Sequence, residues 1–137
     1  MQEITQSFLN ELESQGLNYN DVKETQGREI VNCGVHGKIM DYMVLFIFTG
    51  EHDVEIAAMR LATCPENKKT TLLPLISDFN AKHRWFKLVI MPDGSVNLRA
   101  DSVVSPETSG AICIELFLRA MPIIENILPE INKIIWA

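Results

Sequence analysis

A cysteine and a histidine three residues apart, Cys33 and His36, come nearest in this chain to a metal-binding pair. A structural zinc site needs four ligands, and no second pair has the matching spacing. The pair also falls in a predicted strand, where residues three apart point to opposite faces and cannot reach one ion without a bulge. We therefore interpret both residues as structural, and we expect no metal and no other cofactor.

Candidate catalytic nucleophiles are present, but their pattern does not support an enzyme. Ser77, Asp78 and His83 have the residue types of a hydrolase triad. The chain lacks the Gly-x-Ser-x-Gly turn that exposes a nucleophilic serine. Cys64 and Cys113 are further candidates, and Cys113 falls in an apolar helical run, where a cysteine behaves as a small inert hydrophobe. We expect a protein that is not an enzyme and has no catalytic residue.

Two loop segments could bind ions or phosphate. Residues 51–55, Glu-His-Asp-Val-Glu, are acidic. A calcium loop places oxygen ligands at set alternate positions around a central glycine, which this segment does not do. Gly34 and Gly37 lack the helix start and the Lys-Ser/Thr pair of a phosphate loop. We interpret the acidic segment as a charged turn, and the two glycines as signs of a bulge or an early end of the strand.

One cluster combines positive charge with an aromatic ring: residues 82–87, Lys-His-Arg-Trp-Phe-Lys, with Lys68, Lys69 and Arg99. RNA-binding sheets display such side chains on an open face. The other interpretation is a solvated sheet edge, on which Trp85 packs against lysine and arginine stems. The net charge of −6 disfavours a broad contact with phosphates. We favour the sheet edge and keep an RNA-binding module as an alternative.

The composition is that of a globular protein. Its 137 residues, 47% apolar and 22% charged, predict a single domain over residues 1–137 with a sizeable core. Three widely spaced cysteines and an opening segment without a basic, apolar leader favour free thiols in a reducing cytoplasm. The most apolar tract, residues 111–128, is interrupted by charges and proline, so we expect no membrane span.

Hydrophobic periodicity predicts a helix followed by four strands. Residues 3–15 have helical spacing, and Gly16 suits the helix end. The period then changes to two, and short turns between the strands favour an antiparallel meander. The strand at 41–49 is apolar from Tyr42 to Phe48, which predicts a central strand covered on both faces by helices or by another subunit. The predicted strands span residues 19–24, 29–36, 41–49 and 54–62.

Two more helices are predicted, over residues 65–79 and from 106 to the end. Pro74 predicts a kink or a later start in the first. Pro122 and Pro129 are expected to break the last helix into pieces. Its wide apolar stripe leaves a thick core, a homodimer interface and a groove for a partner open as explanations. The methionines suit either an adaptable groove or core filling, among them Met40, Met43 and Met59.

A hairpin is predicted between these helices, over residues 84–91 and 95–101, with Asp93-Gly94 in the turn. Asn80 is expected to end the preceding helix. Since strand side chains alternate, one face of the hairpin joins the core and the other meets solvent. The solvent-facing set consists of Trp85, Lys87, Asn97 and Arg99.

Four segments resemble the bacterial YbjN-domain family, at residues 76–87, 91–101, 110–121 and 129–137. They keep their order along nearly the whole chain. The most specific is Asn-x-x-x-Arg-Trp-x-Lys at 80–87, which follows a helix and opens a hairpin. The resemblance implies a fold like that of type III secretion chaperones and a place among regulators of bacterial sensory transduction. It implies no catalytic residue.

Together these patterns predict an α+β domain of type III secretion chaperone-like fold, in the order α-β-β-β-β-α-β-β-α. We expect an antiparallel sheet with helices on one face. We expect it to bind a protein or peptide partner by burying apolar surface, with a small-ligand sensory domain, an RNA-binding module and a homodimer as alternatives. The predicted contact surface comprises Trp85, Lys87, Asn97 and Arg99 of the hairpin and Tyr42, Phe46 and Phe48 of the apolar strand.

Overall fold

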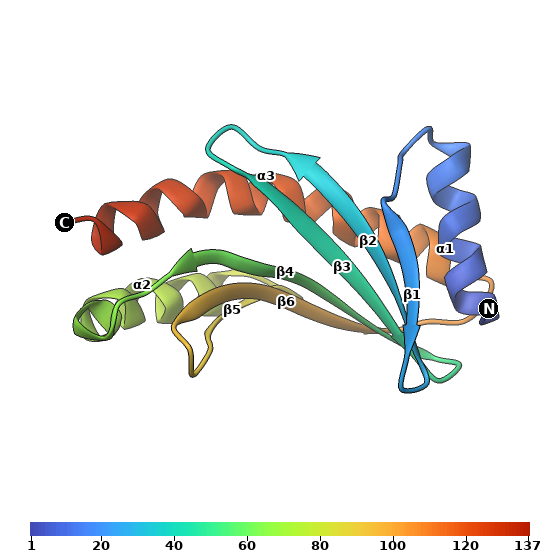
Figure 1. Cartoon of the computed structure of the whole chain (residues 1–137), viewed down its shortest axis with the longest axis horizontal. Coiled ribbons are helices and arrows are strands. Elements are labelled where there is room, and N and C mark those ends of the chain that lie inside the picture. Colours follow the sequence, from blue (N-terminus) through green and yellow to red (C-terminus); the bar gives the residue numbers. More distant parts are fainter.

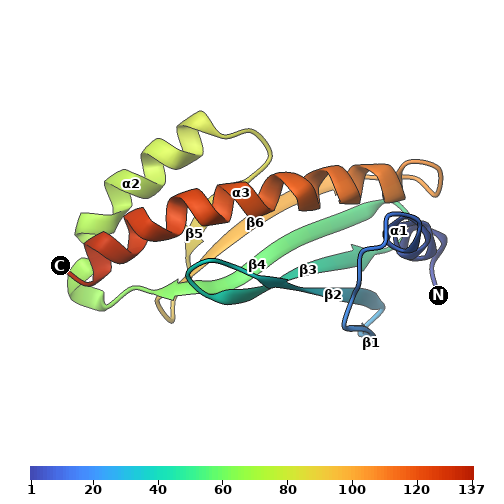
Figure 2. The same ribbon diagram turned by 90° about the horizontal axis from the view of Figure 1, so that it is seen from above.

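A six-stranded antiparallel sheet runs through the computed structural model, which describes residues 1–137 (Figure 1). The strands lie in the order β1-β2-β3-β4-β6-β5. Figure 2 shows that the helices cover one face of this sheet. The predicted fold class and element order are therefore confirmed. The strands are β1 (Asp21–Thr25), β2 (Arg28–His36), β3 (Asp41–Thr49), β4 (Asp53–Thr63), β5 (Lys87–Ile90) and β6 (Ser95–Val103).

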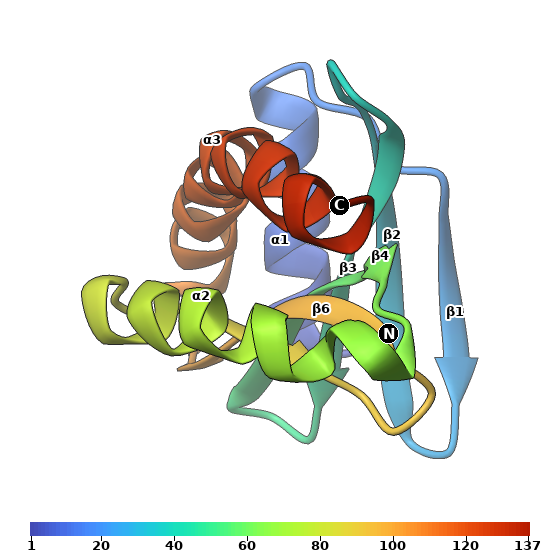
Figure 3. The same cartoon turned by 90° about the vertical axis from the view of Figure 1, so that its left-hand side faces the viewer.

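Three helices complete the domain: α1 (Glu3–Ser14), α2 (Lys69–Lys82) and α3 (Ser109–Ile135), with a short 3-10 turn at Glu66–Lys68 before α2. In Figure 3 the helices stand beside the strands, and α3 contacts both α1 and α2. None of the three is both long enough and apolar enough to cross a bilayer.

Aromatic packing joins the helices to the sheet. The Phe46 ring of β3 lies 4.3 Å from the Phe8 ring of α1 and 5.6 Å from the Phe117 ring of α3, measured between centroids. All three side chains are buried. Aromatic pairs at such distances add stabilisation beyond the area they bury. Phe46 therefore lies at the point where α1, α3 and the sheet meet.

Within this chain only one face of β3 is covered, so the prediction that helices cover both faces is wrong, and cover by another subunit stays a prediction. Tyr42, Val44, Phe46 and Phe48 face the helices and are buried, while Met43 on the opposite face is 52% exposed. A strand can therefore read as apolar throughout and still present one face to water.

Pro122 and Pro129 do not break the last helix as predicted, since α3 is one helix of 27 residues that contains both. α2 begins at Lys69, later than residue 65 as Pro74 led us to expect, and it contains Pro74. All three prolines are exposed. A proline removes one backbone hydrogen bond and frees the carbonyl four residues earlier. On a solvent-facing side water can satisfy that carbonyl, and a long helix already tilts its outer carbonyls toward water.

The sheet divides at one end between β3 and β4. Their pairing runs from Val44 opposite Ala58 to Thr49 opposite Asp53 and goes no further toward the β2–β3 loop. In Figure 1 the β2–β3 hairpin and the β4–β6 pair diverge from a shared end, and α3 crosses behind the opening. We call this opening, between residues 41–43 of β3 and 59–63 of β4, the notch.

Candidate functional site

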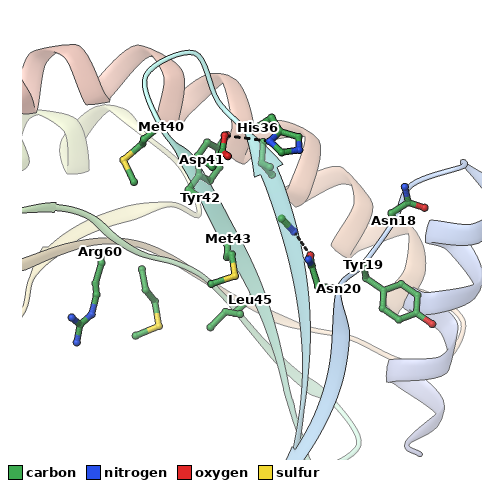
Figure 4. Close-up of a pocket in the computed structure, with 13 residues that line it drawn as sticks. Asn18, Tyr19, Asn20, His36, Met40, Asp41, Tyr42, Met43, Leu45 and Arg60 are labelled. Atoms are coloured by element: carbon green, nitrogen blue, oxygen red, sulfur yellow. Dashed lines mark hydrogen bonds and ion pairs between the residues drawn. The ribbon is translucent and has the colours of Figure 1, made fainter.

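The notch opens into a cavity of about 790 Å³ on the uncovered face of the sheet. Its apolar lining includes Met40, Met43, Leu45 and Met59. Figure 4 shows Met40 and Met43 on the β3 side of the gap and Arg60 on the β4 side. The structure thus brings together three methionines that lie up to 19 residues apart in sequence (59 − 40 = 19). Unbranched thioether side chains can adapt their shape to different apolar surfaces.

A wide β-bulge places Met59 and Arg60 at the notch. Ala58 pairs with Leu98 and Ala62 pairs with Val96, so three residues of β4 stand opposite one residue of β6, Asn97. Arg60 adopts a left-handed conformation with φ +56°. Its backbone N–H donates to Asn97 Oδ1 at 2.8 Å. A bulge of this kind redirects side chains, and here it leaves Met59 48% exposed.

The helix side of the notch is also apolar. A second cavity, of about 400 Å³, is lined by Met40, Leu61 and the end of α3, including Ile135 and Trp136. Met40 lines both cavities. Trp136 and Ile39 are exposed beside it. The notch therefore presents apolar side chains on both sides of the sheet.

The β2–β3 loop is held against α3 at the edge of the notch. The Glu125 carboxylate of α3 accepts a hydrogen bond from the Lys38 N–H, at 3.2 Å for Oε2. Gly37 lies so close to this contact that an added Cβ would collide with the Met40 carbonyl oxygen and approach Glu125 Oε1 to 2.7 Å. The close approach requires glycine at position 37 and fixes the position of Met40.

The charges at the notch are exposed and weakly engaged. His36 Nδ1 lies 3.3 Å from Asp41 Oδ1, and Arg60 lies 3.7 Å from the Asp93 carboxylate. Lys38 is exposed on the β2–β3 loop. Exposed ion pairs contribute little stability. Arg60 can therefore exchange Asp93 for another carboxylate at small cost.

The apolar-strand residues of the predicted contact surface lie in the core. Tyr42, Phe46 and Phe48 are all buried against the helices. The prediction that they belong to a contact surface is therefore wrong. The register of β3 points the even-numbered side chains toward the helices and leaves Met43 on the outer face.

Three hairpin residues of that surface, Lys87, Asn97 and Arg99, share the outer face of the hairpin, because Lys87 pairs with Arg99 and Asn97 lies two residues before Arg99 on β6. Each of them is engaged within the chain. Lys87 Nζ donates to the carbonyls of Asn80 and His83 at 2.8 and 2.7 Å, which satisfies the C-terminal end of α2. Arg99 pairs with Glu55, and Asn97 is buried in the bulge. Whether the exposed members contact a partner stays a prediction.

Trp85 lies apart from these residues because it precedes β5 and breaks the strand alternation. Its φ is +65°, an uncommon conformation for a bulky side chain. The Arg119 guanidinium of α3 lies 5.0 Å from its ring centroid, within range of a cation–π interaction. Trp85 therefore belongs to the helix side of the domain and not to the outer face of the hairpin.

Asn80 does not end α2, which continues to Lys82. Its side chain instead bonds both backbone groups of Leu88: Oδ1 accepts from the Leu88 N–H at 2.7 Å, and Nδ2 donates to the Leu88 carbonyl at 3.0 Å. The family-like segment at 80–87 thus contains a clamp that ties α2 to β5.

The candidate catalytic residues do not form a triad in this structure. Asp78 pairs with Lys82 at 2.9 Å. The His83 ring stacks on Phe79, and its Nδ1 lies 2.9 Å from the Phe79 carbonyl oxygen. Cys33 is buried on the helix side of β2, while His36 is exposed. No group of three or more His, Cys, Asp or Glu side chains could hold a metal ion.

Burial governs the chemistry of the thiols. It raises the pKa of Cys33 and of Cys113 to about 12, and it also raises the pKa of Cys64. The thiolate is the reactive form. At pH 8 we expect Cys33 and Cys113 to resist a disulfide reagent such as DTNB in the folded protein, and all three cysteines to react after denaturation. Rapid reaction of three thiols in the native protein would contradict this burial.

The same shifts give a pH dependence with a defined sign. Thiols of the unfolded chain ionise near pH 8.5, whereas Cys33 and Cys113 do so only near pH 12 when folded. The unfolded state therefore loses protons first as the pH rises. We expect the free energy of unfolding to fall between about pH 8.5 and 12, measured by urea titration, and a Cys33→Ala, Cys113→Ala variant to show a smaller fall.

Comparison with known proteins finds similarity at the level of structure and not of sequence families. No family model matches the chain, and no curated protein matches it. Among solved structures, YbjN, described as a candidate transcription regulator from E. coli, is similar at 16% identity, with a TM-score of 0.46. The alignment covers 93% of this chain and 84% of that chain. The similarity does not establish membership of the family that the sequence resembles.

Proposed function

We propose that this protein is a non-enzymatic binding module that takes an apolar segment of a partner protein into the notch. The observation that carries the proposal is the gathering of Met40, Met43 and Met59 around one cavity, with Met43 and Met59 about half exposed. Exposed apolar patches rimmed by polar groups are characteristic of interaction sites. Methionine-lined surfaces are used where partners vary in shape.

Two other functions have less support. A small-ligand sensory domain fits the volume of the cavity, since ligand pockets span about 300–1,000 Å³. Its lining, however, includes side chains that stand open to water, such as Met43 and Met59. For an RNA-binding module the cations near Trp85 are few: Arg84 is exposed, but Lys82 is paired with Asp78 and Lys87 caps α2. These engagements weigh against RNA.

A peptide selection tests the proposed function. Short random peptides displayed on phage are selected against the protein, and the enriched peptides are synthesised. We expect Met43→Asp to weaken their binding by at least about tenfold, because a carboxylate would have to be desolvated beneath the peptide. Trp136, which lies at the notch, reports binding by fluorescence when Trp85→Phe removes the other tryptophan.

Val103→Asp is the matched control for Met43→Asp. Val103 is exposed at the far end of β6, opposite Asp53, where the sheet is closed. The Val103→Asp variant introduces the same charge as Met43→Asp and should leave peptide affinity unchanged. The proposed function would be refuted if no peptide were enriched, or if Met43→Asp and Val103→Asp had equal effects.

A further inference from the structure

One edge of β3 is unpaired where it borders the notch. Residues 41–43 pair with β2 on one side, His36 opposite Asp41 and Gly34 opposite Met43. On the other side the ladder with β4 begins only at Val44. The backbone groups of this edge that point toward β4 therefore have no backbone partner within the chain. Such an edge is a template for another strand.

Resting on the proposed function, we propose that the bound segment is an extended peptide that pairs as an added β-strand with residues 41–43 of β3. Its alternate apolar side chains contact Met43 and Met59, and an acidic side chain pairs with Arg60. The opposite edge, on β4, is irregular because of the bulge at Met59–Leu61, so the added strand pairs with β3 alone.

The open edge selects between an extended and a helical occupant. Any apolar segment that fills the notch displaces the water from residues 41–43. A buried backbone group that is left without a partner is destabilising. A helix satisfies its own N–H and C=O groups and has none to offer, whereas an extended segment pairs with the edge as it covers it. Binding of a helix would therefore leave the edge groups of residues 41–43 without partners, whereas binding of an extended segment would not.

The charges at the notch favour an acidic side chain in the occupant. Arg60 and Lys38 are exposed on opposite sides of the opening. The nearby Asp41 carboxylate is already engaged by His36. Arg60 faces Asp93 in the free protein, and an acidic side chain of the occupant would exchange with that exposed carboxylate. Complementary charge sets register and partner choice more than affinity.

The chain has two edge strands, β1 and β5, and neither suits the notch. On β5 the N–H and C=O of Leu88 are already bonded to the Asn80 side chain. β1 reads Asp-Val-Lys-Glu-Thr and carries one apolar side chain in five positions. It would place charge against Met43 and Met59. The expected occupant is therefore a segment of a different protein. If a second copy of the chain filled the notch, sedimentation velocity without added peptide would show the mass of a dimer. That result would contradict this assignment.

Backbone N-methylation tests the binding mode. A peptide from the selection above is methylated at one amide at a time, and affinity is read from Trp136 fluorescence in the Trp85→Phe protein. A strand paired on one edge uses alternate N–H groups. Because the open edge spans three residues, we expect losses of about fivefold or more at one or two alternate amides of the peptide and little change at the amides beside them. Hydrogen exchange at the amides of residues 41–43 should also slow when the peptide binds.

Charge reversal tests the acidic contact. Arg60→Glu should weaken an acidic peptide by at least about threefold, and replacing that acidic residue of the peptide by lysine should restore binding.

The two proposals fail in distinguishable ways. Peptide binding that Met43→Asp abolishes, but without alternation in the methylation series and without slower exchange at 41–43, would overturn the strand mode and leave the proposed function standing. Absence of any peptide binding would overturn both.

Discussion

Phe46→Ala is expected to lower the free energy of unfolding by about 3–5 kcal/mol. The side chain has no exposed surface. Its ring contacts Phe8 of α1 and Phe117 of α3, so its removal leaves a cavity where two helices meet the sheet. Small domains have about 5–15 kcal/mol of stability in total. The loss would therefore be a large part of it, and is measured by urea or guanidinium unfolding.

Met43→Ala on the same strand is the control. Met43 lies three residues before Phe46 on the opposite face and is half exposed, so its truncation should change the free energy of unfolding by less than about 1 kcal/mol. Equal losses for the two variants would show that the outer face is as buried in solution as the core. That result would point to a second molecule covering the sheet and would contradict an open notch in the free protein.

Local periodicity predicted most of the elements. The first helix, the strand at 41–49 and the hairpin after Asn80 all formed close to their predicted bounds. Helical spacing identified the first helix, an unbroken apolar run identified the strand at 41–49, and alternation around a turn identified the hairpin. The turn at Gln26-Gly27 has positive φ at both positions, as a tight hairpin requires. The order of elements followed because neighbouring strands joined by short turns pair with one another.

The predicted site was less accurate because it depends on contacts distant in sequence. The strand Tyr42–Phe48 has apolar residues on both faces, and periodicity alone does not tell which face the helices cover. The separation of β3 from β4 depends on the bulge opposite Asn97, 37 residues after Arg60 (97 − 60 = 37). The methionines were open to either interpretation, groove or core, until the register placed Met43 and Met59 outside.

Side chains that bond the backbone were also missed. Asn80 was predicted to end a helix, and Asn97 was predicted to lie on the solvent-facing side of the hairpin. Asn80 instead bonds Leu88, and Asn97 bonds Arg60. Asparagine is often found at helix ends and turns for its local hydrogen bonds. A distant backbone partner leaves no mark on the local pattern, so the clamp and the bulge could be found only in three dimensions.

Asn97→Leu is expected to lower the free energy of unfolding by about 1–3 kcal/mol. The side chain is 2% exposed, and its Oδ1 accepts the N–H of Arg60. Leucine has a similar size but no acceptor, so the Arg60 N–H would lose its partner inside the bulge. Because that contact holds Met59 and Arg60 at the notch, the variant should also bind selected peptides less tightly. Urea unfolding and Trp136 fluorescence measure the two effects.

Asn32→Leu on β2 separates the loss of this contact from the general effect of replacing an asparagine on the sheet. Asn32 lies on the same uncovered face as Asn97, but its buried Oδ1 has no hydrogen-bond partner, and its Nδ2 contacts only Met43 Sδ at 3.1 Å. Replacing an unsatisfied polar group by an apolar one of similar shape is nearly neutral or stabilising. If Asn32→Leu destabilised the protein as much as Asn97→Leu, the bulge contact would not be the source of the loss. A stable Asn32→Leu beside a weakened Asn97→Leu would trace the geometry of the notch to one hydrogen bond between β6 and β4.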